Sequence, residues 1–494
     1  MLVVDRLSVA DATALHTQTP TTPAHTVVVL VLEASDQLSH QRLQQFVASS
    51  LSHLARLRSR LVGKPMGVGQ PVWVEIDGYD ASRQIHTATV ATPGGSGELA
   101  DLVTKLVDGV ADWRRSPWEA WSIDGLAAGR WAVVVKMSPV LCEDGHGVAA
   151  LWQRLVTSEK HPERTSPPEH GPGPAPSLVA LVTDTVTETI ENQITGVWMV
   201  AEAATTALLT MRRRLSNADE SPVAPSPIRG AVPKLAFNAP LTRRRSTAFA
   251  SIRLADVTTI GDAFGGSTAN VVLAACTLAL RSWLLRYDAA PPDPLLLVVP
   301  LSLPAGDAAH PGRPSNTAHI EAPVHLDDPV QVLSELHTVT ERLAFANRYG
   351  NEITAPPVDF ATVISLLPPW MTRRATQMSS GLGLTRLRAP NRHGAVSFTG
   401  QPSGRAYCAG SEVLGMYVIE PLVEGCGLNI GVTTHGDAMD VCISVCPDNV
   451  PDVEQISSGI GDAVAVLLAA AAQSPRGQGR SVVTEMTSHI SKRS

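Results

Sequence analysis

WAVVVKMSPVLCEDGHGVAALWQRL, residues 131–155, is the stretch that decides the fold class of this chain. It opens on an apolar, largely β-branched run that ends in a lysine at position 136, which predicts a buried strand. After Gly147 apolar residues recur at helical spacing, which predicts a helix whose buried face is made of Val148, Leu151, Trp152 and Leu155. A strand followed by a short loop and a helix indicates a protein built from α/β layers.

Strands and helices are mixed in the same way on both sides of this stretch. Residues 26–32 and 295–301 predict two further buried strands, whereas residues 271–280 are apolar on nearly every side and predict a buried helix. Residues 428–445 alternate apolar with polar or small side chains around a turn at 435–437, which predicts a β-hairpin. The expected fold class is α/β (α+β), with two layered domains packed together.

A proline-rich segment divides the chain into two halves. Residues 166–176 contain five prolines and two glycines, a composition typical of a surface linker. Residues 178–215 then predict one or two helices, and a second proline-rich stretch follows at 221–233. The expected division is an N-terminal domain at 1–164, a linker with crossover helices at 165–234, a C-terminal domain at 235–476 and a polar tail at 477–494.

Composition excludes several classes of function. The net charge of −7 and the 4% aromatic content argue against nucleic-acid binding, which favours a basic stripe with stacking residues. Six cysteines without Cys-x-x-Cys or zinc-ligand spacing indicate reduced thiols and no metal centre. The sequence opens without a secretory signal, and no stretch reaches the roughly 18 uncharged apolar residues of a spanning helix. The expected location is cytoplasmic, at most peripheral on membranes or lipid droplets.

Six short elements occur in order between residue 6 and about residue 452. The first is RLSVAD at 6–11 with TPTTPAH at 19–25, and the second is SPWE at 116–119 before IDGL at 123–126. The others are NAP at 238–240 with RRR at 243–245, GMY at 415–417, PLVEG at 421–425 and GLNI at 427–430. Together they resemble the elements of the bacterial wax ester synthase/diacylglycerol acyltransferase family.

This resemblance implies both a fold and a reaction. The fold is two domains of the chloramphenicol acetyltransferase type (CoA-dependent acyltransferase), joined by a long crossover. The reaction transfers a long-chain acyl group from acyl-CoA to diacylglycerol or a fatty alcohol, which gives triacylglycerol or wax ester. It runs in a tunnel between the domains, with acyl-CoA as a substrate and with no cofactor, metal or covalent acyl-enzyme.

The resemblance also implies a catalytic base. An alcohol needs a proton acceptor as it attacks a thioester, and histidine suits that role near neutral pH. The family uses the second histidine of His-His-x-x-x-Asp-Gly, which follows a strand and precedes a helix. Aligned on Asp144 and Gly145, this sequence has Pro139 and Val140 at the histidine positions, and aligned on the strand it has Ser138 and Pro139. Neither alignment supplies an imidazole.

Asp144 and His146 are the catalytic candidates that remain, with Glu143 as a further one. The alternative is that His146 only caps the helix or packs locally. The N-terminus of a helix disfavours a protonated imidazole, which makes a histidine there a weaker proton acceptor. Four further residues are expected to have structural roles in the family motifs: Gly145, Pro117, Trp118 and Asn270. Asn270 belongs to an Ala-Asn pair where the family has Asn-Asp, and residues 396–401 replace its proline-containing turn.

Two hypotheses of different classes follow. The first is an acyl-CoA-dependent O-acyltransferase of neutral-lipid synthesis, and the second is a catalytically silent homologue that binds acyl-CoA or lipid, or partners an active relative. The basic runs at 212–214 and 243–245 suit either anionic phosphates or solvated surface arginines. Seven scattered histidines are interpreted as surface or locally bonded residues: His25, His310, His319, His325, His337, His393 and His435.

Overall fold

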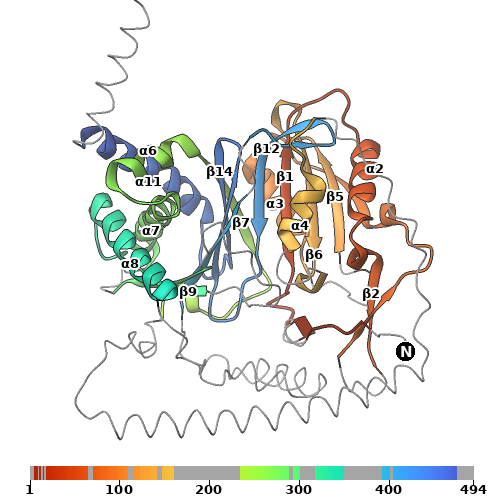
Figure 1. The fold of residues 1–494 in the computed structure, drawn as a ribbon, viewed down its shortest axis with the longest axis horizontal. Helices are drawn as coiled ribbons and strands as arrows, with labels where there is room; N and C mark the ends of the chain where they lie inside the picture. Colours follow the sequence, from red (N-terminus) through yellow and green to blue (C-terminus); the bar gives the residue numbers. More distant parts are fainter. Residues whose placement is uncertain are drawn as a thin grey trace, which may run out of the picture.

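A computed structural model describes residues 5–8, 11–12, 15, 18–64, 70–109, 116, 118–141, 147–160, 234–288, 293–300, 317–349, 392–400 and 404–474. Two six-stranded sheets lie side by side, with helices on their outer sides (Figure 1). The five short 3₁₀ turns of the described chain are η1 Ala55–Arg58, η3 Ala81–Gln84, η4 Ala127–Gly129, η5 Pro139–Leu141 and η7 Ala236–Asn238.

The first sheet has the strand order β11-β12-β1-β6-β5-β4. Its outer face packs on α2 (His40–Leu51) and α4 (Gly147–Leu155), and its inner face packs on α3 (Ser96–Leu106) and reaches the second sheet. A separate hairpin pairs β2 (Ser59–Val62) with β3 (Val72–Glu75). The sheet strands are β1 Thr26–Leu32, β4 Ile85–Thr89, β5 Trp118–Asp124, β6 Trp131–Met137, β11 Tyr407–Cys408 and β12 Ser411–Ile419.

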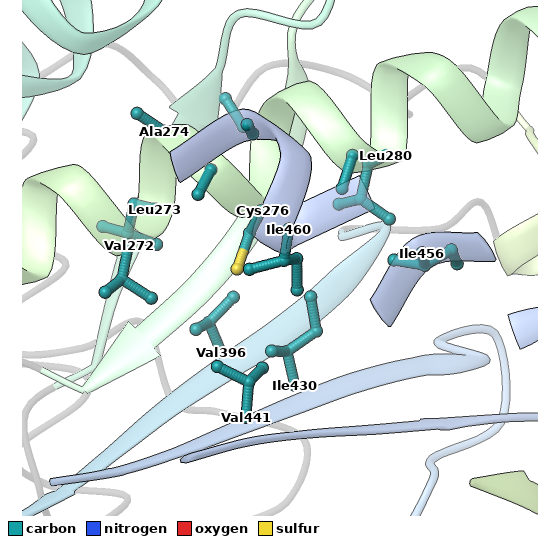
Figure 2. Packing of buried hydrophobic residues seen from close by; sticks show 14 of the residues in the cluster. Val272, Leu273, Ala274, Cys276, Leu280, Val396, Ile430, Val441, Ile456 and Ile460 are labelled. Atoms are coloured by element: carbon teal, nitrogen blue, oxygen red, sulfur yellow. The ribbon is translucent and has the colours of Figure 1, made fainter. Parts of the chain in front are cut away.

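The second sheet has the strand order β7-β14-β13-β10-β8-β9. Its outer face carries α6 (Leu254–Phe264), α7 (Thr268–Tyr287), α8 (Pro329–Tyr349) and α11 (Val453–Gln473). Figure 2 shows Cys276 and Ile460 of the helices above Val396, Ile430 and Val441 of the sheet. The strands are β7 Ser246–Arg253, β8 Leu295–Pro300, β9 Thr317–Ala322, β10 Gly394–Gly400, β13 Leu428–His435 and β14 Ala438–Val445.

The elements expected from local pattern are confirmed. The predicted strands are β1, β6 and β8, the hairpin is β13–β14, and the all-round apolar helix is the centre of α7. In α4, Leu151, Trp152 and Leu155 are fully buried. Residues 166–176, 178–215 and 221–233 lie outside the described residues, so the domain boundaries stay a prediction.

Helices α7 and α11 are both long and apolar enough to cross a bilayer by length and composition. They pack against each other, and their apolar side chains join the core over the second sheet. The all-round apolar character of α7 follows from this position, because α8, α11 and the sheet surround it. Helix α7 is therefore a core helix of the second half, and α11 buries one face in the same core.

Strand β12 links the two halves, which the sequence did not predict. It follows the second-half strand β10 in sequence, yet it pairs antiparallel with β1 in the first sheet, with Val27 opposite Ile419. The other edge of β12 pairs with β11 only at Ser411 and Glu412, and β12 also packs against β13 and β14. There the N–H of Met416 donates to Asp440 Oδ2 at 2.6 Å. An exposed strand edge is a site of unwanted pairing, and the inner face of the second sheet covers this one.

The close approach of β12 explains the glycine at position 431. A Cβ added to Gly431 would lie 2.5 Å from the carbonyl oxygen of Val418. No larger residue fits there unless the two sheets move apart, because backbone atoms cannot rotate away as a side chain does. Gly431 therefore sets the spacing between β12 and the second sheet.

We expect Gly431→Ala to lower the free energy of unfolding by about 1–3 kcal/mol, the usual cost of overpacking a close contact. The matched control is Gly461→Ala, an exposed helical glycine of α11 with open space around its Cα, and it should stabilise by up to about 1 kcal/mol. Chemical denaturation of the three proteins checks this. Equal stability of wild type and Gly431→Ala would show that the β12 contact is not tight.

Candidate active site between the two sheets

The loop after β6 begins at Ser138 and enters the turn η5, Pro139–Leu141. Val140 and Leu141 are buried and belong to the hydrophobic core on the outer face of the first sheet, together with α4. Val140 is therefore a core side chain and offers no group that accepts a proton. Asp144, Gly145, His146 and Glu143 lie outside the described residues.

Trp118 and Asn270 both have evident structural contacts, while Pro117 lies outside the described residues. The Trp118 indole is 1% exposed, and its Nε1 donates to the Leu57 carbonyl and the Tyr79 hydroxyl, both at 3.0 Å. Asn270 Nδ2 lies 3.2 Å from His337 Nδ1, and its Oδ1 accepts from Thr340 Oγ1 at 3.0 Å. Trp118 thus anchors β5 in the first core, and Asn270 ties α7 to α8.

The inner face of the second sheet is polar although it is buried. Asn429, Thr433, Asp440 and Ser444 are all buried there, opposite the apolar face that holds the helices. Among the described residues, Thr433 Oγ1 and Asp440 Oδ1 have no hydrogen-bond partner. Buried polar atoms are normally paired, so unpaired ones at an interface indicate a place for water or a polar ligand.

Asp440 joins three strands at this interface. Its Oδ2 accepts from Met416 N and lies 2.6 Å from His435 Nε2, and both side chains are almost completely buried. His435 and Asp440 belong to β13 and β14, whereas Met416 belongs to β12. The pair therefore holds the β13–β14 hairpin against the first sheet.

Glu420 lies where β12 leaves the first sheet and faces the second. Asn429 Nδ2 of β13 is 3.4 Å from Glu420 Oε2. Burial raises the pKa of this carboxyl, and hydrogen bonding opposes the shift only in part. Ionisation of Glu420 is therefore less favourable in the folded protein than in the unfolded chain.

We expect Glu420→Gln to raise the melting temperature at pH 8 but not at pH 4. The folded-state pKa lies above the unfolded value, so wild type loses stability as the pH rises from the unfolded to the folded pKa. A glutamine does not ionise and avoids this loss. Thermal unfolding at both pH values checks it, with exposed Glu335→Gln as the control. A gain that is equal at pH 4 and pH 8 would contradict the assignment.

Two family models match the chain. The model described as "Wax ester synthase/diacylglycerol acyltransferase catalytic domain" matches residues 7–272, and "WS/DGAT C-terminal domain" matches residues 316–467. The chain belongs to this family. The catalytic-domain match contains β1, β6 and the loop after β6, and the C-terminal match contains β12 and the β13–β14 hairpin. The resemblance inferred from short motifs is confirmed.

Two mycobacterial relatives align with this acyltransferase-family chain over nearly its whole length. A candidate diacylglycerol O-acyltransferase of Mycobacterium tuberculosis, Rv1760, is 27% identical over 492 residues, covering 96% of this chain and 92% of the relative. One of Mycobacterium bovis, Mb0919, is 26% identical over 490 residues, covering 95% and 92%. The family assignment thus holds for both halves.

Two solved structures have a fold similar to that of this chain. The wax ester synthase/diacylglycerol acyltransferase of Marinobacter aquaeolei VT8 aligns with a TM-score of 0.66 at 20% identity, covering 94% of this chain and 99% of that one. The first condensation domain of the calcium-dependent antibiotic synthetase aligns with 0.51 at 15% identity, covering 95% and 97%. The predicted two-domain α/β fold of the CoA-dependent acyltransferase type is confirmed.

His25 is buried, which the sequence interpretation did not predict. It was expected to be a surface or locally bonded histidine, yet it is 9% exposed, and its Nδ1 has no partner among the described residues. His393 Nδ1, by contrast, accepts from the backbone N–H of Leu296 at 2.9 Å, as expected of a locally bonded ring. Position 25 carries no sequence signal of burial, because it lies just before the apolar run of β1.

Cationic side chains from both halves lie around His25. Lys136 of β6 is 5% exposed, and Arg245 comes directly before β7. Arg245 donates to the Thr242 carbonyl at 2.6 Å and also to the Thr21 carbonyl of the first half. Burial first, then Lys136 and Arg245, lower the pKa of His25 to about 3, so its imidazole is neutral at physiological pH.

The cysteines and the possible metal ligands of the described residues offer no further candidate site. The five cysteines in that part of the chain are buried and form no disulfide with one another, and burial raises the pKa of the Cys276 thiol to about 12. No group of three or more histidine, cysteine or acidic side chains there is placed to hold a metal ion. Cys142 lies outside the described residues.

Proposed function

We propose that this chain transfers a long-chain acyl group from acyl-CoA to the hydroxyl of diacylglycerol or a fatty alcohol, giving triacylglycerol or wax ester. The observation that supports this best is that the family's catalytic-domain model matches residues 7–272, which include β6 and α4 on either side of the motif loop. The relatives named as candidate diacylglycerol O-acyltransferases support the same substrate class.

The reaction needs no covalent enzyme intermediate. The acceptor oxygen attacks the thioester carbonyl carbon, the new C–O bond forms, and the C–S bond then breaks. The hydroxyl proton leaves the oxygen during attack and ends on the sulfur of coenzyme A. The buried interface between the sheets suits this chemistry, because excluding water protects the thioester from hydrolysis and strengthens local electrostatic interactions.

A second candidate is a silent homologue that binds acyl-CoA or lipid without turnover. The observation that favours it is the loss of imidazole from the motif loop, where Val140 packs into the core of the first half. Loss of a general base typically slows a reaction by about 10²–10⁴-fold. The two candidates share ligands and differ only in turnover.

Labelled palmitoyl-CoA, with dioleoylglycerol or hexadecanol as acceptor, separates them. We expect purified full-length protein to form labelled ester in step with release of coenzyme A, and heat-denatured protein to form none. Background product together with saturable binding of palmitoyl-CoA would establish the silent homologue instead. Asp144→Ala and His146→Ala, assayed in parallel, test the two motif candidates.

We further propose that the protein works at the surface of a membrane or lipid droplet, where its acceptor dissolves. The acceptor is an apolar lipid that gathers at such a surface. Leu285 of α7 and Val466 of α11 are more than half exposed, and apolar side chains gain free energy when they leave water for an apolar phase. Flotation with dioleoylglycerol-containing vesicles tests this, and protein that stays at the bottom of the gradient would contradict it.

A further inference from the structure

We propose that His25 accepts the proton of the attacking hydroxyl, in place of the histidines that the motif loop lacks. This inference rests on the proposed acyl transfer and names the residue that makes it feasible. It concerns a side chain at the start of β1, about 110 positions before the motif loop in the sequence.

The β1–β6 ladder brings His25 to the motif loop. Its last pair is Thr26 with Met137, so one step further His25 stands opposite Ser138, the first residue of that loop. Side chains alternate along a strand, which puts His25 on the same face as Val27. Val27 belongs to the apolar cluster of the inner face, which also includes Cys442 of the second sheet. The ring therefore lies at the junction of the halves, beside the position of the missing histidines.

The imidazole is in the chemical form that a proton acceptor needs. The ring is neutral, and its Nδ1 is buried without a partner among the described residues. Leaving such an atom unpaired is unfavourable in a folded protein, so an occupant that hydrogen-bonds to it is expected. In the tautomer that carries its proton on Nε2, Nδ1 has a lone pair and can accept one hydrogen bond from a substrate hydroxyl.

The charges around His25 suit the transition state of acyl transfer. Lys136 and Arg245 both act electrostatically on His25. Lys136 in turn interacts with Glu119 and Asp108, and Arg245 with Cys446, Asp108 and Glu424. Before attack these cations oppose protonation of His25. As the thioester oxygen becomes negative, it offsets the two cations and makes transfer of the proton to His25 favourable. Preorganised cations facing a developing oxyanion are a large source of rate acceleration.

With His25 as the carrier, the proton of the acceptor hydroxyl is accounted for at each step. The acceptor O–H bond breaks as the C–O bond forms, and the proton moves to Nδ1. When the C–S bond breaks, the same proton passes from Nδ1 to the thiolate of coenzyme A, which restores the neutral ring. The ester and free coenzyme A leave, and no oxidant, metal or further reactant is needed.

The test compares wild type, His25→Gln and the exposed control His325→Gln in the palmitoyl-CoA assay. We expect His25→Gln to lower kcat by about 10²–10⁴-fold with little change in KM, and His325→Gln to match wild type. Binding of palmitoyl-CoA, measured in the same preparations, shows that each variant is folded. A His25→Gln protein within tenfold of wild type would overturn the proposal.

A pH profile of the wild type tests the same proposal without a variant. The acidic limb of kcat/KM reports the base in the free enzyme. With His25 as the base, that limb lies near pH 3, so kcat/KM stays flat from pH 8 down to pH 5. An acidic limb centred near pH 6.5 would assign the base to another histidine and overturn the proposal. Wild type that forms no ester would overturn both this proposal and the proposed function.

Discussion

Asp440→Ala is expected to lower the free energy of unfolding by about 2–6 kcal/mol, because it leaves two buried hydrogen-bonding groups without a partner, at about 1–3 kcal/mol each. The substitution leaves the Met416 N–H and the His435 ring without their acceptor in the interface between the sheets. Because β12 meets the second sheet there, the loss should also loosen the contact between the halves. Denaturant unfolding and the rate of limited proteolysis measure the two effects.

Asp440→Asn is the matched comparison. Met416 N and His435 Nε2 both contact Oδ2, so an amide oxygen in that place can accept from the Met416 N–H and from an Nε2–H of His435, while the amide nitrogen takes the place of Oδ1. We therefore expect Asp440→Asn to retain at least half of the stability that Asp440→Ala loses. Equal losses in the two variants would mean that charge, rather than hydrogen bonding, holds the interface.

Acid should destabilise the protein through His25. Its pKa is about 3 in the folded protein against 6.5 in the unfolded chain, so only the unfolded chain takes up this proton between those values. The stability associated with the neutral ring is complete above pH 6.5 and falls as the pH drops toward 3. The full loss is roughly 5 kcal/mol, at about 1.4 kcal/mol for each pH unit.

His25→Gln removes this titration and should flatten the curve. The variant starts from a different stability, so the informative quantity is the slope of its difference from wild type between pH 6 and pH 4. We expect wild type to lose about 1.4 kcal/mol per pH unit relative to the variant in that window. Parallel curves would show that His25 is protonated, or solvated, in the folded protein.

Local pattern was sufficient for most of the framework. The strands at 26–32 and 131–137 and the hairpin at 428–445 follow from runs and alternation of side chains, because these depend on near neighbours in sequence. The pairing of β12 with β1 did not follow. A strand's own pattern shows which face is apolar, whereas its partner is chosen by the packing of the whole chain.

The site was less predictable for a related reason. The alternation of apolar and polar residues around Asp440 predicts a strand with one buried face and one solvent-exposed face. In the structure β12 covers the polar face, and Asp440 is therefore buried. His25 likewise shows no periodic signal, and the two cations that lower its pKa, Lys136 and Arg245, come from two distant segments. The motif comparison did locate the loop after β6 and the absence of its histidines, because that inference needed only sequence order.

Single-turnover ester formation is the most direct test of the account. Wild-type protein in excess over labelled palmitoyl-CoA is mixed with dioleoylglycerol, and bound thioester and ester are quantified in the same samples. We predict that bound palmitoyl-CoA converts to triacylglycerol, with one coenzyme A released for each ester formed. Palmitoyl-CoA that stays bound and intact while the acceptor is present would contradict the account.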